Sequence, residues 1–363
     1  MDIYIKTMER LLHVVQDLSA ARDLNTVMDI VRHSARDLTG SDGATFVLRD
    51  NNFCYYAEED ALSPLWKGKR FPIEICISGW VMLNRHPAVI EDIYSDPRIP
   101  IDAYKKTFVK SLATVPIKTK EPIGAIGCYW GTMHNATAEE VKIMQVLADT
   151  AAIAMDNIHY QTIIASKARL LEEAIDDTLL AVARMVEQKD LYTAGHQRRV
   201  ALISLEVAKE IGLPEENCNN VYRAGLVHDI GKIAIPSDLL SKPARLTPLE
   251  FSLIKTHPEV GYAILKDIPL LRPIAEMILQ HHERLDGSGY PNGLKTNQIL
   301  PEAQIIAVSD VFESMVSHRP YRPALGKEAA IEEILSNRGR LYSPDIADAI
   351  VRLVDQKGYQ IPQ

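Results

Sequence analysis

From Thr137 to Ala194 the chain contains no proline and no glycine, and this feature limits most strongly what the chain can fold into. Thr137 is a favourable helix-capping residue, and Glu139 and Glu140 place carboxylates in the first turn, where the helix dipole favours negative charge. Proline and glycine are the residues that most often end a helix. The sequence therefore predicts one long helix over residues 137–187, which separates an N-terminal part from a C-terminal part.

The length and charge of the chain agree with two domains that bind neither DNA nor a membrane. The 363 residues correspond to about two domains of roughly 150 to 200 residues. The net charge of -8 argues against a general nucleic-acid binder. No apolar run of about 18 residues occurs, and the N-terminus lacks the basic and apolar regions of a signal peptide. We therefore expect a cytoplasmic location.

The four cysteines show no Cys-x-x-Cys spacing, which argues against a disulfide framework or a zinc ribbon. We expect reduced thiols in the protein core.

The N-terminal part has the pattern of a small α+β domain. Its first 38 residues show apolar side chains at helical spacing, which predicts two amphipathic helices. Segments typical of strands follow, and turn-forming residues separate them. The predicted strands cover residues 44–48, 53–56, 111–117 and 123–130. A region of this kind forms a mixed α+β layer structure.

The long helix carries an apolar repeat with two possible interpretations. Met144, Leu147, Ala151, Ala154 and Ile158 follow three-four spacing, so they lie along one side of the helix. This side either packs on the sheet of its own domain or forms a seam with the same helix of a second copy. We expect the second arrangement, a homodimer through the connecting helix.

The C-terminal part has helical patterns joined by short turns that contain proline or glycine, and no convincing alternating strand interrupts them. The predicted helices cover residues 196–211, 216–229, 248–255, 259–266, 270–284, 301–317, 327–337 and 344–356. We therefore expect an all-α domain.

Several polar residues stand where these helices should be apolar. Asp310 lies within the apolar run 305–312, where an unpaired carboxylate would be unfavourable. A lone histidine at a helix end is more often a core or capping residue, but His228 is followed by Asp229. Such a pair can supply nitrogen and oxygen ligands to adjacent metal ions, with the carboxylate bridging. The other histidines at helix ends or starts are His196, His257, His281 and His282.

The motifs around these residues occur in a specific order. They are Tyr192-Thr193-Ala194-Gly195-His196, His228-Asp229-Ile230-Gly231-Lys232, His257-Pro258-Glu259, His281-His282-Glu283-x-x-Asp286-Gly287-x-Gly289-Tyr290-Pro291 and Arg319-Pro320-Tyr321-Arg322. This order resembles the HD-GYP family of bacterial cyclic di-GMP phosphodiesterases. The resemblance implies an HD-domain helical bundle over residues 174–363 and hydrolysis of cyclic di-GMP to pGpG, with GMP as the product of a second cleavage.

The resemblance also implies a metal centre with two divalent ions, usually iron or manganese. One ion would be held by His196, His228, Asp229 and Asp310, and the other by Asp229, His257, His281 and His282. Mixed nitrogen and oxygen ligation suits both metals. Some members of the family bind a third ion through a glutamate at the position of Tyr192, so we expect two ions here.

Two ions held by a shared carboxylate imply a bridging hydroxide that attacks the phosphorus atom. Asp229 and Lys232 would be the catalytic residues, with Lys232 placing an ammonium group near the phosphate. Arg319 and Arg322 present guanidinium groups suited to phosphate oxygens, or anchor a loop by ion pairs. Tyr290 either stacks on guanine or packs the loop.

The N-terminal part, residues 1–160, resembles a GAF domain, a less specific match. GAF domains bind small molecules or dimerise, and the ligand here is unknown. We expect the domain to regulate the enzyme through the long helix, which leads to the helix of His196.

In the HD-GYP family that the C-terminal part resembles, the Gly-Tyr-Pro loop is implicated in contacts with GGDEF-domain proteins, which are therefore possible partners. The expected fold is an α+β GAF-like domain joined by a long helix to an all-α HD-GYP bundle.

Two departures from the family pattern leave the substrate open. His318 replaces the aspartate that the family usually has before Arg319. Residues 311–315 also differ from the sequence that is common in the family at these positions. The substrate could therefore be another nucleotide, such as 3′,3′ cyclic GMP-AMP. The chain could also be a different HD hydrolase, or a regulator that binds its ligand without cleaving it.

Overall fold

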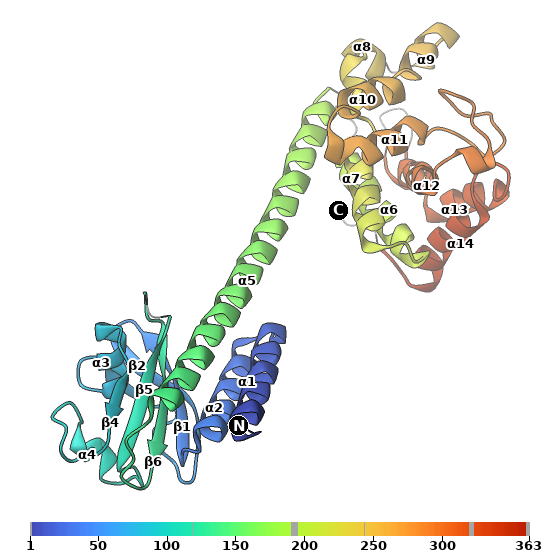
Figure 1. Ribbon diagram of the computed structural model, residues 1–363. Helices are drawn as coiled ribbons and strands as arrows, with labels where there is room; N and C mark the ends of the chain where they lie inside the picture. The colour runs from blue at the N-terminus through green and yellow to red at the C-terminus, as the bar shows by residue number, and fades with distance from the viewer. Residues whose placement is uncertain (1, 119, 190–194, 243, 319–322, 361–363) are drawn as a thin grey trace. The chain divides into compact units, whose positions relative to one another are not determined.

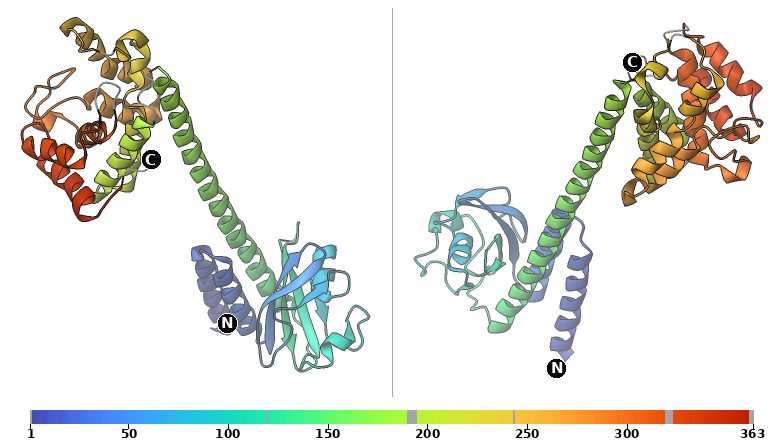
Figure 2. Two further views of the ribbon diagram at one scale, coloured as in Figure 1. Left: turned by 180° about the vertical axis from the view of Figure 1, so that it is seen from behind. Right: turned by 90° about the horizontal axis from the view of Figure 1, so that it is seen from above.

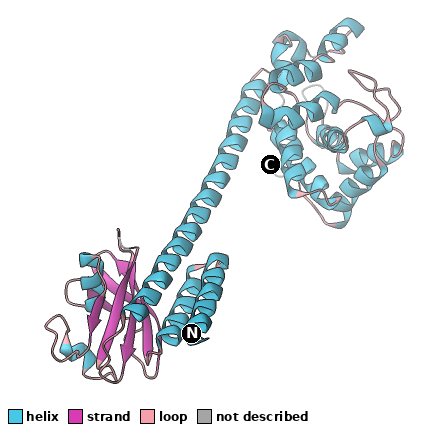
Figure 3. Cartoon of the chain, viewed as in Figure 1, coloured by secondary structure: helices cyan, strands magenta, loops and turns pink. Residues whose placement is uncertain are grey.

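The computed structural model describes residues 2–118, 120–189, 195–242, 244–318 and 323–360. The chain divides into two compact units, Met1–Ala168 and Arg169–Gln363. In the described residues, strands occur only in the first unit, and the regular structure of the second unit is helical (Figure 3). The predicted fold class is confirmed: an α+β domain, a long helix and a helical domain.

The first unit is built on a six-stranded sheet with the order β3-β2-β1-β6-β5-β4, in which every neighbouring pair is antiparallel. The strands are β1 (Gly43–Asp50), β2 (Phe53–Ala61), β3 (Arg70–Pro72), β4 (Ala88–Ile90), β5 (Ser111–Ile117) and β6 (Gly124–Trp130). The four predicted strands correspond to β1, β2, β5 and β6. Strands β3 and β4 are absent from the prediction, because three residues are too few to show an alternating pattern.

Helices cover both faces of this sheet. Helices α1 (Asp2–Ala20) and α2 (Leu24–Thr39) and the first part of α5 (Ala138–Glu187) lie on one face (Figures 1 and 2). Helices α3 (Ile77–Asn84) and α4 (Ile101–Tyr104) belong to the core on the other face. Each face of the sheet therefore has its own apolar core, and β5 and β6 are buried at every position.

The apolar repeat of α5 belongs to the core of the first unit. Met144, Leu147, Ala151 and Ala154 are buried there, and Ile158 packs against the same cluster. The prediction that these five residues form a dimer seam is therefore wrong, and packing on the sheet of their own domain is right. A three-four repeat shows that one side of a helix is buried, but not which surface covers it.

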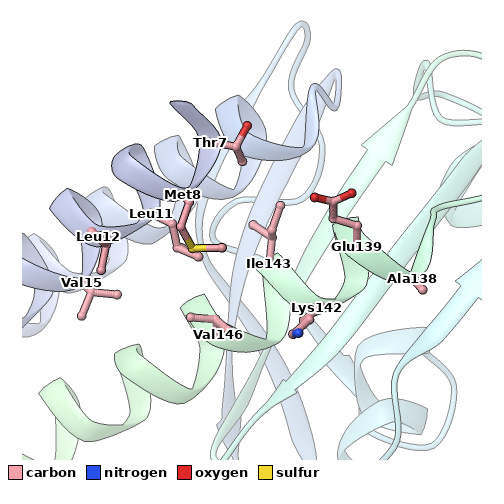
Figure 4. A pocket seen from close by; sticks show the side chains of 10 residues that line it. All are labelled: Thr7, Met8, Leu11, Leu12, Val15, Ala138, Glu139, Lys142, Ile143 and Val146. Carbon is pink, nitrogen blue, oxygen red and sulfur yellow. The ribbon is translucent and has the colours of Figure 1, made fainter. Parts of the chain in front are cut away.

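A cavity of about 490 Å³ lies between α1 and the beginning of α5 (Figure 4). Both helices line it mainly with apolar side chains, and α5 adds Glu139 and Lys142. The residues that line it are Thr7, Met8, Leu11, Leu12, Val15, Ala138, Glu139, Lys142, Ile143 and Val146.

The second unit is a bundle of helices around one apolar core. Its α-helices are α6 (His196–Glu210), α7 (Glu215–Val227), α8 (Ser237–Leu240), α9 (Pro248–Ile254), α10 (His257–Leu265), α11 (Arg272–Gln280), α12 (Pro301–Val316), α13 (Lys327–Ser336) and α14 (Pro344–Val351). Shorter helical turns are η1 (Ile230–Ala234), η2 (Pro269–Leu271), η3 (Thr296–Gln298) and η4 (Arg352–Gln356). The C-terminal part of α5 joins this core through Leu179 and Val186.

The predicted helices of the second unit are all present, with shifted ends. Helix α11 ends at Gln280, whereas the predicted helix continues to Arg284, and α8 is absent from the prediction. The four cysteines are free and buried, as predicted. In the described part of the chain, no helix is both long enough and apolar enough to span a bilayer.

Candidate metal centre

The predicted metal ligands come together in the second unit. Three groups have ligand atoms close enough to one another to hold an ion. They are His257, His281 and His282; His196, His228 and Asp310; and His228, Asp229 and His281. The first two groups match the two predicted ion sites, and Asp229 lies between them.

The helix ends bring these side chains into the core. His196 is the first residue of α6, His257 is the first of α10, and His281 directly follows α11. His228 and Asp229 follow α7, and Asp310 lies within α12. His228, His257 and His281 are at most 1% exposed. Ionisable groups are seldom buried this completely without partners, so the arrangement itself indicates a site.

Three of the imidazole rings are oriented by backbone carbonyl groups. The Nδ1 atoms of His228, His257 and His281 lie 2.8, 2.8 and 2.6 Å from the carbonyl oxygens three residues earlier. These carbonyls belong to the last turn of a helix, where they have no partner within the helix. Because a carbonyl only accepts hydrogen bonds, each Nδ1 carries the proton. The Nε2 atom of each neutral ring is therefore left with its lone pair for a ligand.

The Nε2 atoms converge on Asp229. The Nε2 atoms of His257 and His281 lie 3.4 Å apart, and Asp229 Oδ1 lies 3.4 Å from His257 Nε2. Asp229 Oδ2 lies 3.6 Å from His228 Nε2. Facing lone pairs of this kind repel one another unless a cation lies between them. The donor set is therefore suited to divalent ions, and it contains nitrogen and oxygen atoms without thiolate.

The pKa values of the histidines support this interpretation. Burial, together with the neighbouring imidazoles, lowers the pKa of His281 to about 3 and also lowers the pKa of His282. Burial lowers the pKa of His257 as well, despite Asp229. These rings are therefore neutral at pH 7, which is the form that binds metal ions.

His196 differs from the other histidines, because it lies between two carboxylates. Its Nε2 atom is 3.2 Å from Asp310 Oδ1, and its Nδ1 atom forms a short hydrogen bond with Glu313. Burial alone would lower the pKa of His196, but the hydrogen bonds with Asp310 and Glu313 outweigh it and raise this pKa to about 9. The carboxylates thereby keep the ring in one orientation.

Asp229 carries a full negative charge in this setting. Burial would raise its pKa, but Lys232 and then His228 and His257 hold it well below its usual range. Lys232 lies on η1, one turn after Asp229, and its Nζ atom donates a hydrogen bond of 2.6 Å to Asp229 Oδ2. The ammonium group predicted to lie near the phosphate is therefore beside the proposed bridging carboxylate.

Tyr290 lies against a predicted metal ligand. Its ring stacks on the ring of His282 at a centroid distance of 4.6 Å and an angle of 28°. The ammonium group of Lys255 lies 5.3 Å from the centre of the Tyr290 ring. Both predicted roles of Tyr290, guanine stacking and loop packing, remain compatible with this position.

Glu313 belongs to the site but is not among the residues predicted from the sequence. Its side chain is fully buried, and its oxygens accept hydrogen bonds from His196, from Arg199 Nε at 2.7 Å and from Ser317 Oγ at 2.7 Å. It is three residues after Asp310, so both carboxylates reach the same ring. The signal that points to Asp310, a carboxylate in an apolar helix, is present at Glu313 too.

Glu283 is the second residue absent from the prediction, and it holds the Gly-Tyr-Pro loop. Its buried carboxylate accepts hydrogen bonds from the backbone N–H groups of Asn292 at 2.7 Å and Leu294 at 2.9 Å. Gly289 allows the loop to approach closely, because a Cβ atom there would lie 2.4 Å from Glu283 Cα. The loop is thus fastened directly to the segment that carries His281 and His282.

Three residues with predicted roles or positions in the site, Arg319, Arg322 and Tyr192, lie outside the described residues.

Each part of the chain matches one family model. Residues 180–346 match the family model for the HD domain, and residues 21–156 match the model for the GAF domain. The three groups of candidate metal ligands described above all lie within the HD match.

Several curated proteins are similar to this chain. A cyclic di-GMP phosphodiesterase of Thermotoga maritima is 42% identical over 50% of this chain and 50% of its own length. The cyclic di-GMP phosphodiesterase PA4108 of Pseudomonas aeruginosa is 29% identical over 80% of this chain and 70% of its own. The 3'3'-cGAMP-specific phosphodiesterase 1 of Vibrio cholerae is 36% identical over 52% of this chain and 44% of its own. The match spans only about half the length of the first and third relatives. Along the chain, the match to the GAF domain model therefore comes first and the match to the HD domain model follows it.

Proposed function

We propose that this chain is an HD-GYP phosphodiesterase that hydrolyses cyclic di-GMP with bound divalent metal ions. The observation that carries the proposal is the convergence of unprotonated Nε2 atoms on Asp229, including the pair of His257 and His281 3.4 Å apart. The names of the Thermotoga and Pseudomonas relatives support the choice of substrate. The order of the motifs supports the choice of family.

The seven predicted ligands divide naturally into two ion sites. His196, His228 and Asp310 would hold one ion, and His257, His281 and His282 would hold the other, with Asp229 shared. The nitrogen and oxygen donors suit iron or manganese, which are the metals that the resemblance to the HD-GYP family implies. When bound, the ions would supply Lewis acidity, which activates water and neutralises charge on the phosphate. Tyr192 supports two ions over three, because a tyrosine stands where a third-metal glutamate is expected.

The remaining site residues would bind the substrate. Lys232 keeps an ammonium group beside Asp229, which suits a phosphate oxygen. Tyr290 presents an aromatic ring next to His282, which suits stacking on guanine. Arg319 and Arg322 are proposed as further phosphate ligands on the basis of their side-chain chemistry.

The proposal is tested with protein purified without oxygen and loaded with Fe²⁺ or Mn²⁺. Incubation with cyclic di-GMP should give pGpG, and chromatography over time would reveal whether GMP follows. The Asp229→Ala variant should lose both the metal and the cleavage. Cleavage by an Asp229→Ala protein shown to be free of metal would refute the proposal, and a metal-loaded wild type that binds but never cleaves would favour a binding-only regulator.

A second substrate is favoured by the Vibrio relative, whose name specifies 3'3'-cGAMP. Both cyclic dinucleotides contain the same 3′-5′ phosphodiester and differ only in one base, so the same metal centre would serve both. Competition between equal concentrations of the two substrates decides between them. A higher kcat/KM for 3′,3′ cyclic GMP-AMP would reassign the substrate without altering the chemistry.

We also propose a homodimer through α5, along a side of the helix other than the one first predicted. Ile153, Tyr160, Ile164 and Leu171 are each at least 60% exposed and follow spacings of seven, four and seven residues. This is the spacing of a coiled-coil seam, and Asn157 stands at a position of the same repeat. Such a polar residue in a seam favours one register, so a parallel pair of α5 helices is the arrangement we propose.

The GAF domain is proposed to regulate the enzyme from the cytoplasm. The apolar cavity between α1 and α5 (Figure 4) is a candidate site for its unknown small ligand, since apolar walls with a few polar groups are typical of ligand sites.

GGDEF-domain proteins are proposed partners of the Gly-Tyr-Pro loop. Binding of an isolated GGDEF domain to wild type, but not to a variant with that loop replaced, would test this partnership.

A further inference from the structure

The C-terminal end of α5 is directly bonded to the beginning of α6. Glu187 is the last residue of α5. One of its carboxylate oxygens, Oε2, accepts a hydrogen bond from the backbone N–H of Gly195 at 3.1 Å. The other, Oε1, accepts one from the backbone N–H of Gln197 at 3.2 Å. Both bonds flank His196, the first residue of α6.

Glu187 supplies the cap that α6 lacks in its own sequence. The residue at the N-cap position of α6 is Gly195, which has no side chain to accept a hydrogen bond. The first N–H groups of a helix have no partner within the helix, and they carry the positive end of the helix dipole. A carboxylate from α5 therefore satisfies these groups with a favourable charge, in place of the usual serine, threonine or aspartate.

The imidazole of His196 is held at its other side by α12. Its Nδ1 atom is bonded to Glu313, and its Nε2 atom lies 3.2 Å from Asp310 Oδ1. Two elements therefore position His196. The carboxylates of α12 orient its ring, and the carboxylate of α5 holds the backbone at the start of α6. A displacement of the end of α5 would move the backbone of His196 relative to Asp310.

The end of α5 is anchored to the same core that carries the metal centre. Val186, the residue directly before Glu187, is buried in that core, and so is Leu179 on the same helix. About three turns earlier on the helix, Asp176 Oδ1 accepts a hydrogen bond of 2.6 Å from the guanidinium of Arg223 on α7. Helix α7 ends immediately before His228. Two of the three helices that supply the first ion site, α6 and α7, are thus bonded to carboxylates of α5.

We propose that Glu187 is the positioning residue through which α5 controls the ion site of His196, His228 and Asp310. The proposal rests on the proposed metal centre and adds a route for its regulation. Loss of the Glu187 carboxylate releases the first turn of α6 and weakens that ion site, while the site of His257, His281 and His282 keeps its affinity. The effect does not depend on the side chains of residues 195 and 197, because Glu187 bonds the backbone N–H groups of Gly195 and Gln197.

The test uses the full-length chain with three variants. Glu187→Ala removes the cap, and Glu187→Gln keeps its shape but removes the charge. Glu173→Gln is the matched control, because Glu173 lies on the same helix and forms an exposed ion pair with Arg169 within it. Mn²⁺ binding is measured by titration. Deuterium exchange of the peptide that begins at Gly195 is measured without added metal.

The expected result is a selective loss at one site. Outer-shell partners of metal ligands typically change affinity by about 10- to 100-fold, so one of the two Mn²⁺ ions should bind at least about tenfold more weakly in Glu187→Ala. The other ion should bind with the same affinity as in wild type. At the weakened site, the Mn²⁺ affinity of Glu187→Gln should lie between those of wild type and Glu187→Ala. The peptide at Gly195 should exchange faster in Glu187→Ala than in Glu173→Gln.

Two results would overturn the inference. One is unchanged exchange and unchanged Mn²⁺ affinity in Glu187→Ala, at the same time as Asp229→Ala has lost its metal. The other is an equal loss of both ions together with a lower melting temperature, because this would show general destabilisation. Failure of the proposed function is distinguishable: wild type would then bind no Mn²⁺, whereas faster exchange in Glu187→Ala would still support the capping role.

Discussion

His257 and His281 face each other with their Nε2 atoms 3.4 Å apart, while the Nδ1 atom of each ring donates a hydrogen bond to a backbone carbonyl. Neither Nε2 atom therefore carries a proton in the neutral rings, so no hydrogen bond joins them. The lone pairs of these two Nε2 atoms therefore face each other, an arrangement that a cation between them would stabilise. This relationship connects the geometry of the helix ends to the predicted metal chemistry.

Replacing His281 by alanine should remove one side of this pair. We expect the variant to lose metal from the site of His257 and His282 and to lose about 100-fold or more of the phosphodiesterase activity. Metal analysis and kcat measured on the same preparation check this. The control is His13→Ala, because His13 is exposed on α1 in the first unit. Equal metal content in the two variants would contradict the assignment.

Replacing Glu313 by glutamine should loosen His196 without removing a ligand. Glutamine has nearly the same size, but its neutral amide cannot accept strong hydrogen bonds from both His196 and Arg199. We expect metal affinity at the site of His196 to fall by about 10- to 100-fold. Titration with Mn²⁺ measures this change. Glu332→Gln, at an exposed position on α13, is the control and should bind like wild type.

Replacing Gly289 by alanine should displace the Gly-Tyr-Pro loop. The added Cβ atom would lie 2.4 Å from Glu283 Cα and 2.5 Å from Arg284 N, so the backbone must move. Because Tyr290 is the next residue, we expect KM for cyclic di-GMP to rise several-fold, with metal content unchanged. Ser288→Ala, an exposed change in the same loop, should leave KM as it is. A wild-type KM in Gly289→Ala would argue against a role of the loop in substrate binding.

The stability contributed by Glu250 should depend on pH. Hydrogen bonds from Lys242 and Thr247 lower the pKa of Glu250 from its ordinary value of 4.5 to about 2. A carboxylate with a lowered pKa stabilises the folded state above its unfolded pKa, and this contribution is lost as the pH falls from about 4.5 towards 2.

The measurement is the difference in melting temperature between wild type and Glu250→Gln. Wild type should be the more stable protein at pH 7, and the difference should shrink below about pH 4.5. Glu259→Gln, at an exposed position on α10, controls for general effects of removing an acidic group. A difference that stays constant as the pH falls well below the ordinary pKa of glutamate would mean that the charge of Glu250 is not responsible.

Introducing charge on the exposed side of α5 should separate the proposed dimer. Ile164→Glu places a carboxylate at the centre of the repeat formed by Ile153, Tyr160 and Leu171, and like charges would then meet across the seam. Light scattering should report a monomer. Thr162→Glu introduces the same charge two residues away on a different side of the helix, and this variant should remain dimeric. If both variants have the mass of wild type, the seam lies elsewhere.

The candidate metal ligands could be recognised in the sequence because they stand at positions where the helical pattern predicts apolar residues. His228-Asp229 and His281-His282 interrupt apolar helices at their ends, and Asp310 interrupts one in its middle. Glu313 obeys the same rule but escapes prediction, since its role depends on which histidine lies opposite it. The role of Glu283 could not be predicted, because its partners are backbone N–H groups and almost every residue type carries such a group.

The sequence by itself determined the long helix, the change from an α+β domain to a helical one and the residue types of the candidate metal centre. Periodicity, capping residues and the absence of proline and glycine act locally, so they can be recognised without a structure. Only the tertiary structure decided what each apolar side of α5 touches, and it assigned Met144, Leu147, Ala151 and Ala154 to the core of the first unit. The physical reason is that burial depends on packing between distant segments. The same reason applies to the stretch that begins with His281 and His282, whose ring nitrogens meet Asp229 only after the ends of several helices have packed together.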